Sequence, residues 1–230
     1  MLLLPGTPPL QVNLRRSAQA KRFSLRVSRL DGRVTLTLPQ RAKEADGIAF
    51  LHKHDAWLRE TLSQMPLAQG ALVGFGCEIM VEGKLLRITP SGARSVTIEA
   101  DQLLVPQSAA PARIAAFLKV LARDRLARAS DHYAAMVKRR YSRLTLRDTR
   151  SRWGSCTADG ALMYSWRLIM APPEVLDYVA AHEVAHLVEM NHSAAFWAVV
   201  ERLCPDWRQQ RKWLHDHGQS LHAYRFGEKE

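Results

Sequence analysis

Cysteine is scarce in this sequence. Only Cys77, Cys156 and Cys204 among its 230 residues are cysteines, and they lie far apart with no CxxC pair. An odd number of isolated thiols gives neither a disulfide framework nor a thiolate zinc site. Because disulfides are rare in reducing compartments, the cysteine pattern predicts a cytoplasmic protein whose fold does not depend on cross-links.

Long apolar runs are also lacking. A membrane-spanning helix needs about 20 consecutive apolar residues, and no segment here approaches that length. The opening MLLLPG lacks a basic n-region and runs at once into prolines, so it resembles neither a signal peptide nor an anchor. No internal repeat and no Walker-type glycine loop is evident. We therefore expect no membrane partner, and a phosphate site would have to be built from Arg and Lys side chains.

Positive charge, in contrast, is abundant and unevenly distributed. The net charge is +11, and residues 106–152 contain 12 Lys and Arg against 3 Asp and Glu, whereas residues 153–230 contain 7 against 10. A concentrated basic segment predicts a surface that binds DNA or another polyanion. The same pattern is typical of a solvated helix face that aids solubility, and both interpretations stay open.

The N-terminal part predicts an antiparallel sheet followed by a helix. Residues 12–38 alternate in the strand period around Asp31-Gly32, a dipeptide typical of tight hairpins. Residues 41–65 then place apolar side chains at helical spacings until Pro66 ends the pattern. Short runs punctuated by glycine, between residues 71 and 106, predict more strands.

The middle of the chain predicts a long helix and a second small sheet. A helix of about 25 residues is expected within Ala112–Arg140, because an apolar stripe there runs beside a face of Arg and Lys. Strands are expected at residues 142–148, 151–160 and 161–170, with the last two joined by a turn at Asp159-Gly160.

The next predicted helix carries the motif with the clearest chemistry. Pro173 and Glu174 suit the first turn of a helix, and the segment that follows contains HExxH at residues 182–186. His182 and His186 are four residues apart, so both imidazoles project from one face and can share a zinc ion. Glu183 points to the neighbouring side, where it can activate a zinc-bound water without being a ligand.

His192 is the predicted third ligand. It lies six residues after His186, and Asn191 before it tolerates the left-handed conformation that ends many helices. A turn there would bring His192 back to the metal. Three nitrogen ligands leave one open tetrahedral position, which is the arrangement of a catalytic zinc site.

Two carboxylates compete with His192 for the third position. Glu201 lies fifteen residues after His186 on the next helical stretch, and Glu189 is nearer. We favour His192 because its place just past a turn is the more natural reach. The histidine spacing equals that of metzincins, but Glu189 replaces their glycine and no methionine after Met190 could form their Met-turn.

The remaining histidines are predicted to have surface or packing roles, since none has a ligand spacing supported by a local fold. They are His52, His54, His132, His215, His217 and His222. A further donor to a transition-state oxyanion would be either Tyr164 or Arg167, on the hairpin before the motif helix.

Several segments resemble the YgjP-like metal-dependent hydrolases, a family related to the SprT-type and WLM-type zincins. The segments are SRWGSC at 151–156, YSWRLIMAPPEVLDYVAAHEVAHL at 164–187, NHSAAFW at 191–197 and PDWRQQRKWL at 205–214. KRFSLRVS and HDAWL extend the resemblance into the N-terminal half. It implies a zincin-type peptidase core, with His182, His186 and His192 as zinc ligands and Glu183 as the catalytic residue.

Together these patterns predict an α+β protein. Residues 1–106 are expected to form a mainly β subdomain with an antiparallel sheet and a helix. Residues 107–230 are expected to form a zincin-like metal-binding catalytic domain with a small β-hairpin sheet. The predicted function is a zinc-dependent hydrolase, favoured as a metallopeptidase acting on a peptide or protein. The alternatives are a metal-dependent nucleotide hydrolase, and a nucleic-acid-binding module with a structural zinc.

Overall fold

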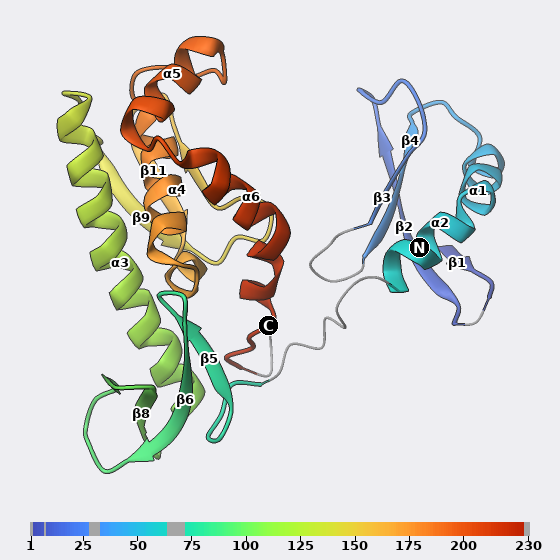
Figure 1. Ribbon diagram of the computed structural model, residues 1–230. Helices are drawn as coiled ribbons and strands as arrows, with labels where there is room; N and C mark the ends of the chain where they lie inside the picture. The colour runs from blue at the N-terminus through green and yellow to red at the C-terminus, as the bar shows by residue number, and fades with distance from the viewer. Residues whose placement is uncertain (1, 7, 28–32, 64–71, 228–230) are drawn as a thin grey trace. The chain divides into compact units, whose positions relative to one another are not determined.

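The computed structural model describes residues 2–6, 8–27, 33–63 and 72–227 (Figure 1). These residues form an α+β protein with three small mixed sheets and six α-helices. The chain divides into two compact units, Met1–Gln69 and Gly70–Glu230. Each unit has its own buried apolar cluster.

The first unit is a four-stranded sheet with two helices. Its strands are hydrogen-bonded in the order β1-β2-β4-β3. Its elements are β1 (Leu2–Leu4), β2 (Leu10–Ser17), β3 (Ser24–Val27), β4 (Val34–Pro39), α1 (Glu44–Lys53) and α2 (Asp55–Ser63). Leu36 and Leu38 of β4 pack with Leu51 of α1 and Leu58 of α2, all of them buried. Gly47 permits this approach, because a Cβ there would lie 2.8 Å from Leu38 Cδ2.

The direction of one strand in this sheet differs from the prediction. The expected hairpin joins β3 and β4, where Val27 pairs antiparallel with Val34, and its Asp31-Gly32 turn lies outside the described residues. β2, however, runs parallel to β4, with Val12 opposite Val34. The prediction of an antiparallel sheet is wrong at this pair, because alternating apolar residues define the buried face of a strand and not its direction.

The single helix predicted for residues 41–65 is two helices. α1 ends before His54, whose backbone lies at φ −106° and ψ 12°, and α2 begins at Asp55. The chain has neither proline nor glycine at this break, so the sequence pattern did not indicate it. Pro66, expected to end the helix, lies outside the described residues.

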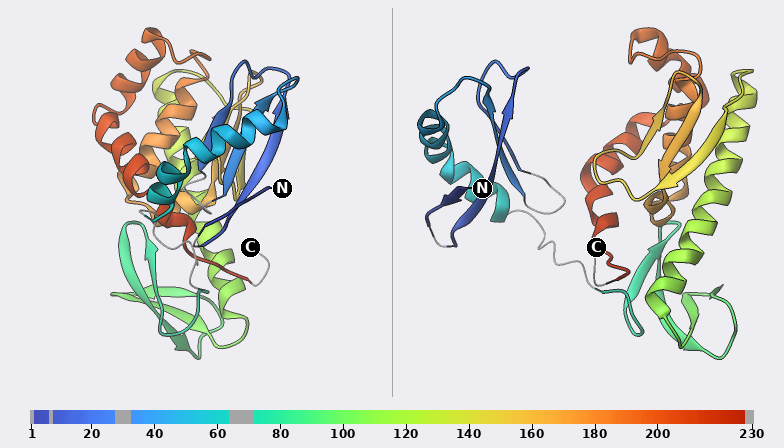
Figure 2. Two further views of the ribbon diagram at one scale, coloured as in Figure 1. Left: turned by 90° about the vertical axis from the view of Figure 1, so that its right-hand side faces the viewer. Right: turned by 180° about the vertical axis from the view of Figure 1, so that it is seen from behind.

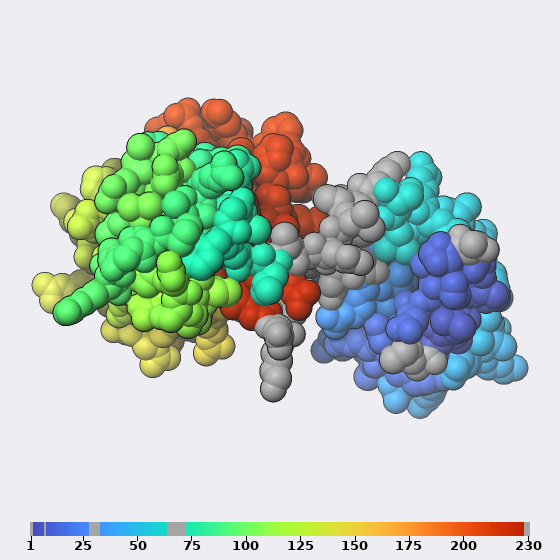
Figure 3. Space-filling view, turned by 90° about the horizontal axis from the view of Figure 1, so that it is seen from below, coloured from blue at the N-terminus to red at the C-terminus, as the bar shows by residue number. Residues whose placement is uncertain are grey.

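The second unit begins with another four-stranded sheet. Its strands, in the order β5-β6-β8-β7, are β5 (Glu78–Val81), β6 (Lys84–Ser91), β7 (Thr97–Glu99) and β8 (Gln102–Pro106). Strands were predicted here, but in one subdomain with the N-terminal sheet and with a boundary after residue 106. The boundary between the two compact units instead falls between residues 69 and 70 of the sequence. The reason is burial, since Leu103 and Val105 of β8 share an apolar cluster with Ile114 of the next helix. In Figure 3 the side chains of this sheet and of the start of that helix form one continuous body.

Helix α3 (Ala110–Met136) is the predicted long basic helix. It ends four residues earlier than expected, and Lys138 just beyond it has a left-handed φ of 54°. Its buried face follows Ile114, Leu118, Ala122, Leu126 and Tyr133. Met136, the last residue of the helix, is 45% exposed.

A three-stranded sheet packs on the helix that carries the HExxH motif. It consists of β9 (Arg143–Arg147), β10 (Gly154–Cys156) and β11 (Ala161–Ser165), in the order β10-β11-β9. β10 and β11 form the predicted antiparallel hairpin, whose turn contains Gly160 at φ 76°. β9 pairs parallel with β11.

The last predicted strand is shorter than expected. Residues Trp166–Met170 form the 3-10 helix η1, and all five are buried. A short apolar run that is buried on every side has no period that distinguishes a strand from a helix, so this assignment was wrong.

Three α-helices complete the second unit. α4 (Pro173–Ala185) begins where Pro172-Pro173 and Glu174 predicted, and it is followed by α5 (Ala194–Leu203), α6 (Trp207–His217) and the 3-10 helix η2 (Gly218–His222). Seen from behind in Figure 2, the yellow strands of the β10-β11-β9 sheet lie in front of these helices. Among the described helices, none is both long enough and apolar enough to cross a membrane.

Candidate metal centre

The end of α4 and the segment after it bring three histidines together. His182 lies in the last turn of α4, and His186 is the residue that caps the helix. Its helical backbone, at φ −66° and ψ −17°, keeps it on the same face as His182. His192 lies between α4 and α5. The predicted helix end at Asn191 was wrong, because α4 already ends at Ala185 and Asn191 is not among the described residues with positive φ.

The spacing of the three rings fits one metal ion. Their candidate ligand nitrogens all lie within 4.8 Å of one another, and the Nε2 atoms of His182 and His192 are 3.1 Å apart. Two nitrogens bound tetrahedrally to one zinc, each at about 2.0–2.1 Å, would be about 3.3 Å apart. Among the described residues, these three histidines are the one group of three or more His, Cys, Asp or Glu side chains close enough together to hold a metal ion.

The protonation states of these rings suit metal binding. His186 Nδ1 lies 3.0 Å from the carbonyl oxygen of Glu189. A carbonyl only accepts hydrogen bonds, so Nδ1 carries the proton and Nε2 keeps its lone pair for a metal. Burial, assisted by the neighbouring histidines, lowers the pKa of His182 to about 3. Burial also lowers the pKa of His186. Both rings are therefore neutral at pH 7, as ligands must be.

Helix α5 fixes the third histidine and covers the site. The side chain of Ser193 caps α5 by accepting a hydrogen bond from the Phe196 N–H, so the helix begins directly after His192. The Phe196 ring stacks on His186 with 4.5 Å between ring centroids. Trp197 faces His192 at 5.9 Å. These rings form an apolar wall beside the candidate ligands.

Glu183 lies on the inner side of α4, against strand β10. Its residue surface is only 6% exposed, and burial raises its pKa to about 8, opposed by the positive charge of Arg152. A Cβ on Gly154 would lie 2.5 Å from Glu183 Oε1, which is closer than non-bonded atoms approach. The carboxyl group therefore occupies its place because residue 154 is glycine. The sequence pattern included this glycine only as part of the SRWGSC segment and did not indicate its role.

The two carboxylates that competed with His192 stay outside the histidine cluster. Glu201 Oε2 accepts hydrogen bonds from Trp207 Nε1 at 2.5 Å and from Arg208 Nη1 at 2.7 Å. Glu189 contributes its backbone carbonyl to His186. Neither carboxylate belongs to the three-histidine cluster.

The residues predicted to stabilise an oxyanion have structural partners instead. Tyr164 is fully buried, and its hydroxyl lies 3.0 Å from Ser130 Oγ. Arg167 is 3% exposed and donates to both carboxylate oxygens of Asp148, at 2.7 and 2.9 Å. The cations whose charge acts on the site are Arg152, toward Glu183, and Arg211, toward His182. Sequence spacing could not identify either of them.

The other predicted packing histidines stay away from the site. His222 lies against Trp153, with the rings tilted and their centroids 5.2 Å apart, and His215 Nδ1 lies 2.9 Å from an Asp216 carboxylate oxygen. In the part of the chain that the structure describes, none of them joins two further ligand side chains.

Comparison with known proteins places this centre in a family context. The family described as YgjP-like, metallopeptidase domain, matches residues 21–217. Among solved structures, the metallopeptidase zymogen abylysin of Pyrococcus abyssi is 17% identical, with a TM-score of 0.36 over 40% of this chain and 93% of that chain. No curated protein matches the chain.

Proposed function

The chain belongs to the YgjP-like metallopeptidase-domain family, and we propose that it is a zinc-dependent peptidase in which Glu183 is the general base. One observation carries the proposal. Three imidazoles converge within 4.8 Å, beside the buried carboxyl group of Glu183. A metallopeptidase hydrolyses a peptide bond with a metal ion held by protein side chains and a general base beside it, and these residues would supply both.

The proposal includes the identity of the metal and of the core. His182, His186 and His192 would hold the ion, and a set of three imidazole nitrogens is typical of zinc. Bound zinc supplies a Lewis acid that polarises a carbonyl and makes water acidic. Helix α4 with its HExxH residues, between α3 and the β10-β11-β9 sheet, would then be the centre of a zincin-like core.

Glu183 would move the protons of the reaction. The burial that raises its pKa makes its carboxylate a stronger base than an exposed glutamate. It would accept a proton from the attacking water and then donate it to the leaving amine. Arg152 and Arg211 are the candidates for orienting an anionic or carbonyl group of the substrate, because their charges reach Glu183 and His182.

A second candidate function is hydrolysis of a phosphoanhydride such as a nucleoside triphosphate. The observation that favours it is the position of Arg152, a cation close to Glu183 that could bind phosphate. A structural zinc is the less favoured alternative, because a closed structural site has four protein ligands and the described residues bring three together.

The test is a substrate screen of the zinc-loaded protein with peptides and nucleoside triphosphates in parallel, using Glu183→Gln as the blank. Glutamine preserves shape and removes the base. The variant should bind zinc at the wild-type stoichiometry and lose at least about 10²-fold in turnover. Peptide cleavage that depends on Glu183 supports the proposal. Cleavage of triphosphates alone would replace it with the second candidate, and equal turnover in both proteins would contradict the role of Glu183.

Metal content tests the ligands separately. His182→Ala, His186→Ala and His192→Ala should each lose most of the bound zinc, whereas Glu201→Ala should keep it. If Glu201→Ala loses zinc and His192→Ala retains it, the third ligand is misassigned.

A further inference from the structure

The outer face of the β10-β11-β9 sheet is a polar groove, and Arg152 is the lining residue whose charge also acts on Glu183. Leu144 and Leu146 of β9 pack toward the apolar core, so Arg143, Thr145 and Arg147 point to the opposite face. Strand pairing aligns Thr145 with Met163 of β11, and Met163 in turn with Ser155 of β10. These side chains line a cavity of about 600 Å³.

The cations of this groove are not neutralised by ion pairs. Arg143, Arg147 and Arg152 line it and are exposed. Among the described residues, none of the three has a carboxylate within 4.0 Å. Asp148, adjacent to β9, is held by Arg167. Asp159 lies in the β10-β11 turn. Hydrogen bonds to Thr157 and to its own backbone lower its pKa, and the positive charge of Arg143 lowers it further.

Five hydroxyl groups also line the groove, and two of them are available to donate hydrogen bonds to a ligand. Thr145, Thr149 and Thr157 already donate to backbone carbonyls. Ser151 and Ser155 line the same cavity, and no hydrogen bond of their hydroxyls to a described side chain or backbone group is found. Proteins bind phosphate oxygens with hydrogen bonds from arginine side chains and from serine or threonine hydroxyls.

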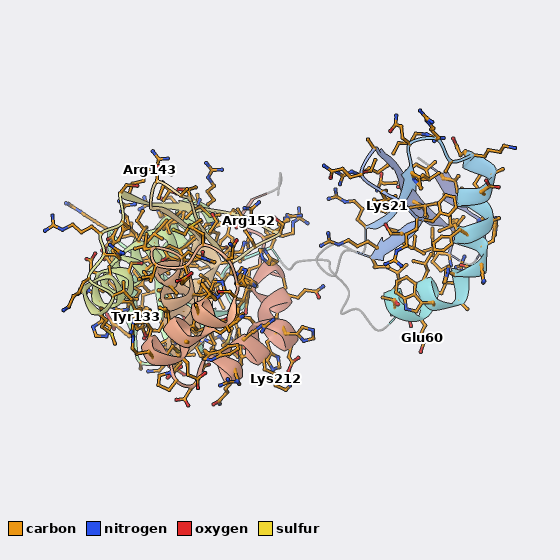
Figure 4. The ribbon with its side chains drawn as sticks, turned by 90° about the horizontal axis from the view of Figure 1, so that it is seen from above. Lys21, Glu60, Tyr133, Arg143, Arg152 and Lys212 are labelled. Atoms are coloured by element: carbon orange, nitrogen blue, oxygen red, sulfur yellow. The ribbon has the colours of Figure 1, made fainter. Side chains whose placement is uncertain are left out.

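The dimensions of the groove favour a single polynucleotide strand. Arg143 and Arg147, four residues apart on one strand, are separated by about 13 Å along it. β9 and β10 are two strand spacings apart, about 10 Å, which is narrower than a duplex. Figure 4 shows Arg143 and Arg152 on the side of the unit away from Lys212.

We propose that this groove binds the sugar–phosphate backbone of a single-stranded nucleic acid, with Arg143, Arg147 and Arg152 as its phosphate contacts. Met163 forms part of the floor, and the cavity lining contains no aromatic side chain on which bases could stack. Binding is therefore mainly electrostatic and independent of base sequence. This inference does not rest on the proposed hydrolysis, since Arg143 and Arg147 lie on the face of β9 opposite the core and nucleic-acid binding is measured without any cleavage.

The test is fluorescence anisotropy of the full chain with a labelled oligothymidylate of about 20 nucleotides, at low salt and without added substrate. About three phosphate contacts predict that affinity falls roughly 20-fold between about 50 and about 200 mM salt. Arg143→Gln/Arg147→Gln/Arg152→Gln should weaken binding at least about 10-fold.

The matched control is Arg87→Gln/Arg94→Gln/Arg202→Gln, which removes the same charge at exposed positions outside the groove. It should keep affinity within about twofold, and thermal melting verifies that both variants are folded. Equal weakening in the two variants would mean that net charge alone attracts the oligonucleotide. Tighter binding of a duplex of equal length, tighter binding of an oligoglutamate peptide, or no binding at low salt would each overturn the proposal.

Discussion

At the residue scale, the position of the Glu183 carboxyl group depends on residue 154 being a glycine. Strand β10 lies so close to α4 that no Cβ fits between them. The histidine spacing predicted the three-histidine cluster from sequence, because its geometry is local to one helix and the segment after it. The glycine that accommodates Glu183 belongs to a strand 29 residues away in sequence, so its role becomes visible only when the sheet is known.

Gly154→Ala should displace the Glu183 carboxylate, since the added methyl would meet Oε1 at 2.5 Å. We expect turnover to fall by about 10-fold or more, while zinc content stays near wild type because Glu183 is not a proposed ligand. Gly92→Ala is the matched control, since a Cβ there meets nothing within 4 Å. Steady-state kinetics and metal analysis are the measurements. Unchanged turnover in Gly154→Ala would show that the position of the carboxylate is unimportant.

His222 predicts a pH dependence of stability. Burial lowers its pKa from 6.5 to about 4. The unfolded chain therefore binds more protons than the folded chain between these values, and the contribution to stability is lost as pH falls from 6.5 toward 4. Between pH 7 and pH 5, the wild type should lose about 1–2 kcal/mol more than His222→Gln. Thermal melting at both pH values measures this, with His132→Gln, an exposed position, as control. The same loss in wild type and His222→Gln would assign the effect to other groups.

At the scale of secondary structure, sequence predicted the elements whose signals are local. Proline and Glu174 marked the start of α4, and Asp159-Gly160 marked the β10-β11 turn. Features decided by tertiary contacts were missed. The parallel pairing of β2 with β4, the break at His54 and the 3-10 helix at Trp166–Met170 depend on what packs against each segment.

The start of α5 offers a test at this scale, because its N-cap also fixes the position of His192. Ser193→Ala removes the hydrogen bond that the Phe196 N–H donates to Ser193 Oγ. We expect a loss of about 1 kcal/mol in the free energy of unfolding and weaker zinc binding. Denaturant unfolding and competition with a chelator measure the two effects. Because Ser193→Asp can also cap the helix, it should restore both. Failure of aspartate to restore zinc affinity would separate the cap from the metal site.

At the scale of the whole molecule, the two units have separate apolar clusters. The buried residues of one cluster run from Leu4 to Leu58 and those of the other from Val73 to Phe226. Sequence placed the boundary near residue 106 because it grouped strands with strands, whereas the β5–β8 sheet is buried against α3. The family match begins at residue 21, so it includes most of the first unit.

We therefore expect residues 70–230, produced alone, to fold and to bind zinc at the stoichiometry of the full chain, because all three candidate ligands and their apolar support lie in that unit. Cooperative thermal unfolding and metal analysis are the measurements. Residues 107–230 are the comparison, and they should unfold at a lower temperature because they lack the sheet that covers α3. Failure of residues 70–230 to fold would show that the first unit is needed for stability.

Strand β10 is three residues long, and its neighbouring side chains face opposite sides of one sheet. Gly154 faces the proposed chemistry and Ser155 faces the proposed polymer groove. Mutation at position 155 should therefore alter the proposed affinity for a nucleic acid while the carboxyl group of Glu183 keeps its place, and position 154 has no such freedom. Two adjacent codons thus place separate demands on one short strand, a small residue at 154 for the proposed hydrolysis and a polar one at 155 for the proposed recruitment to a nucleic acid.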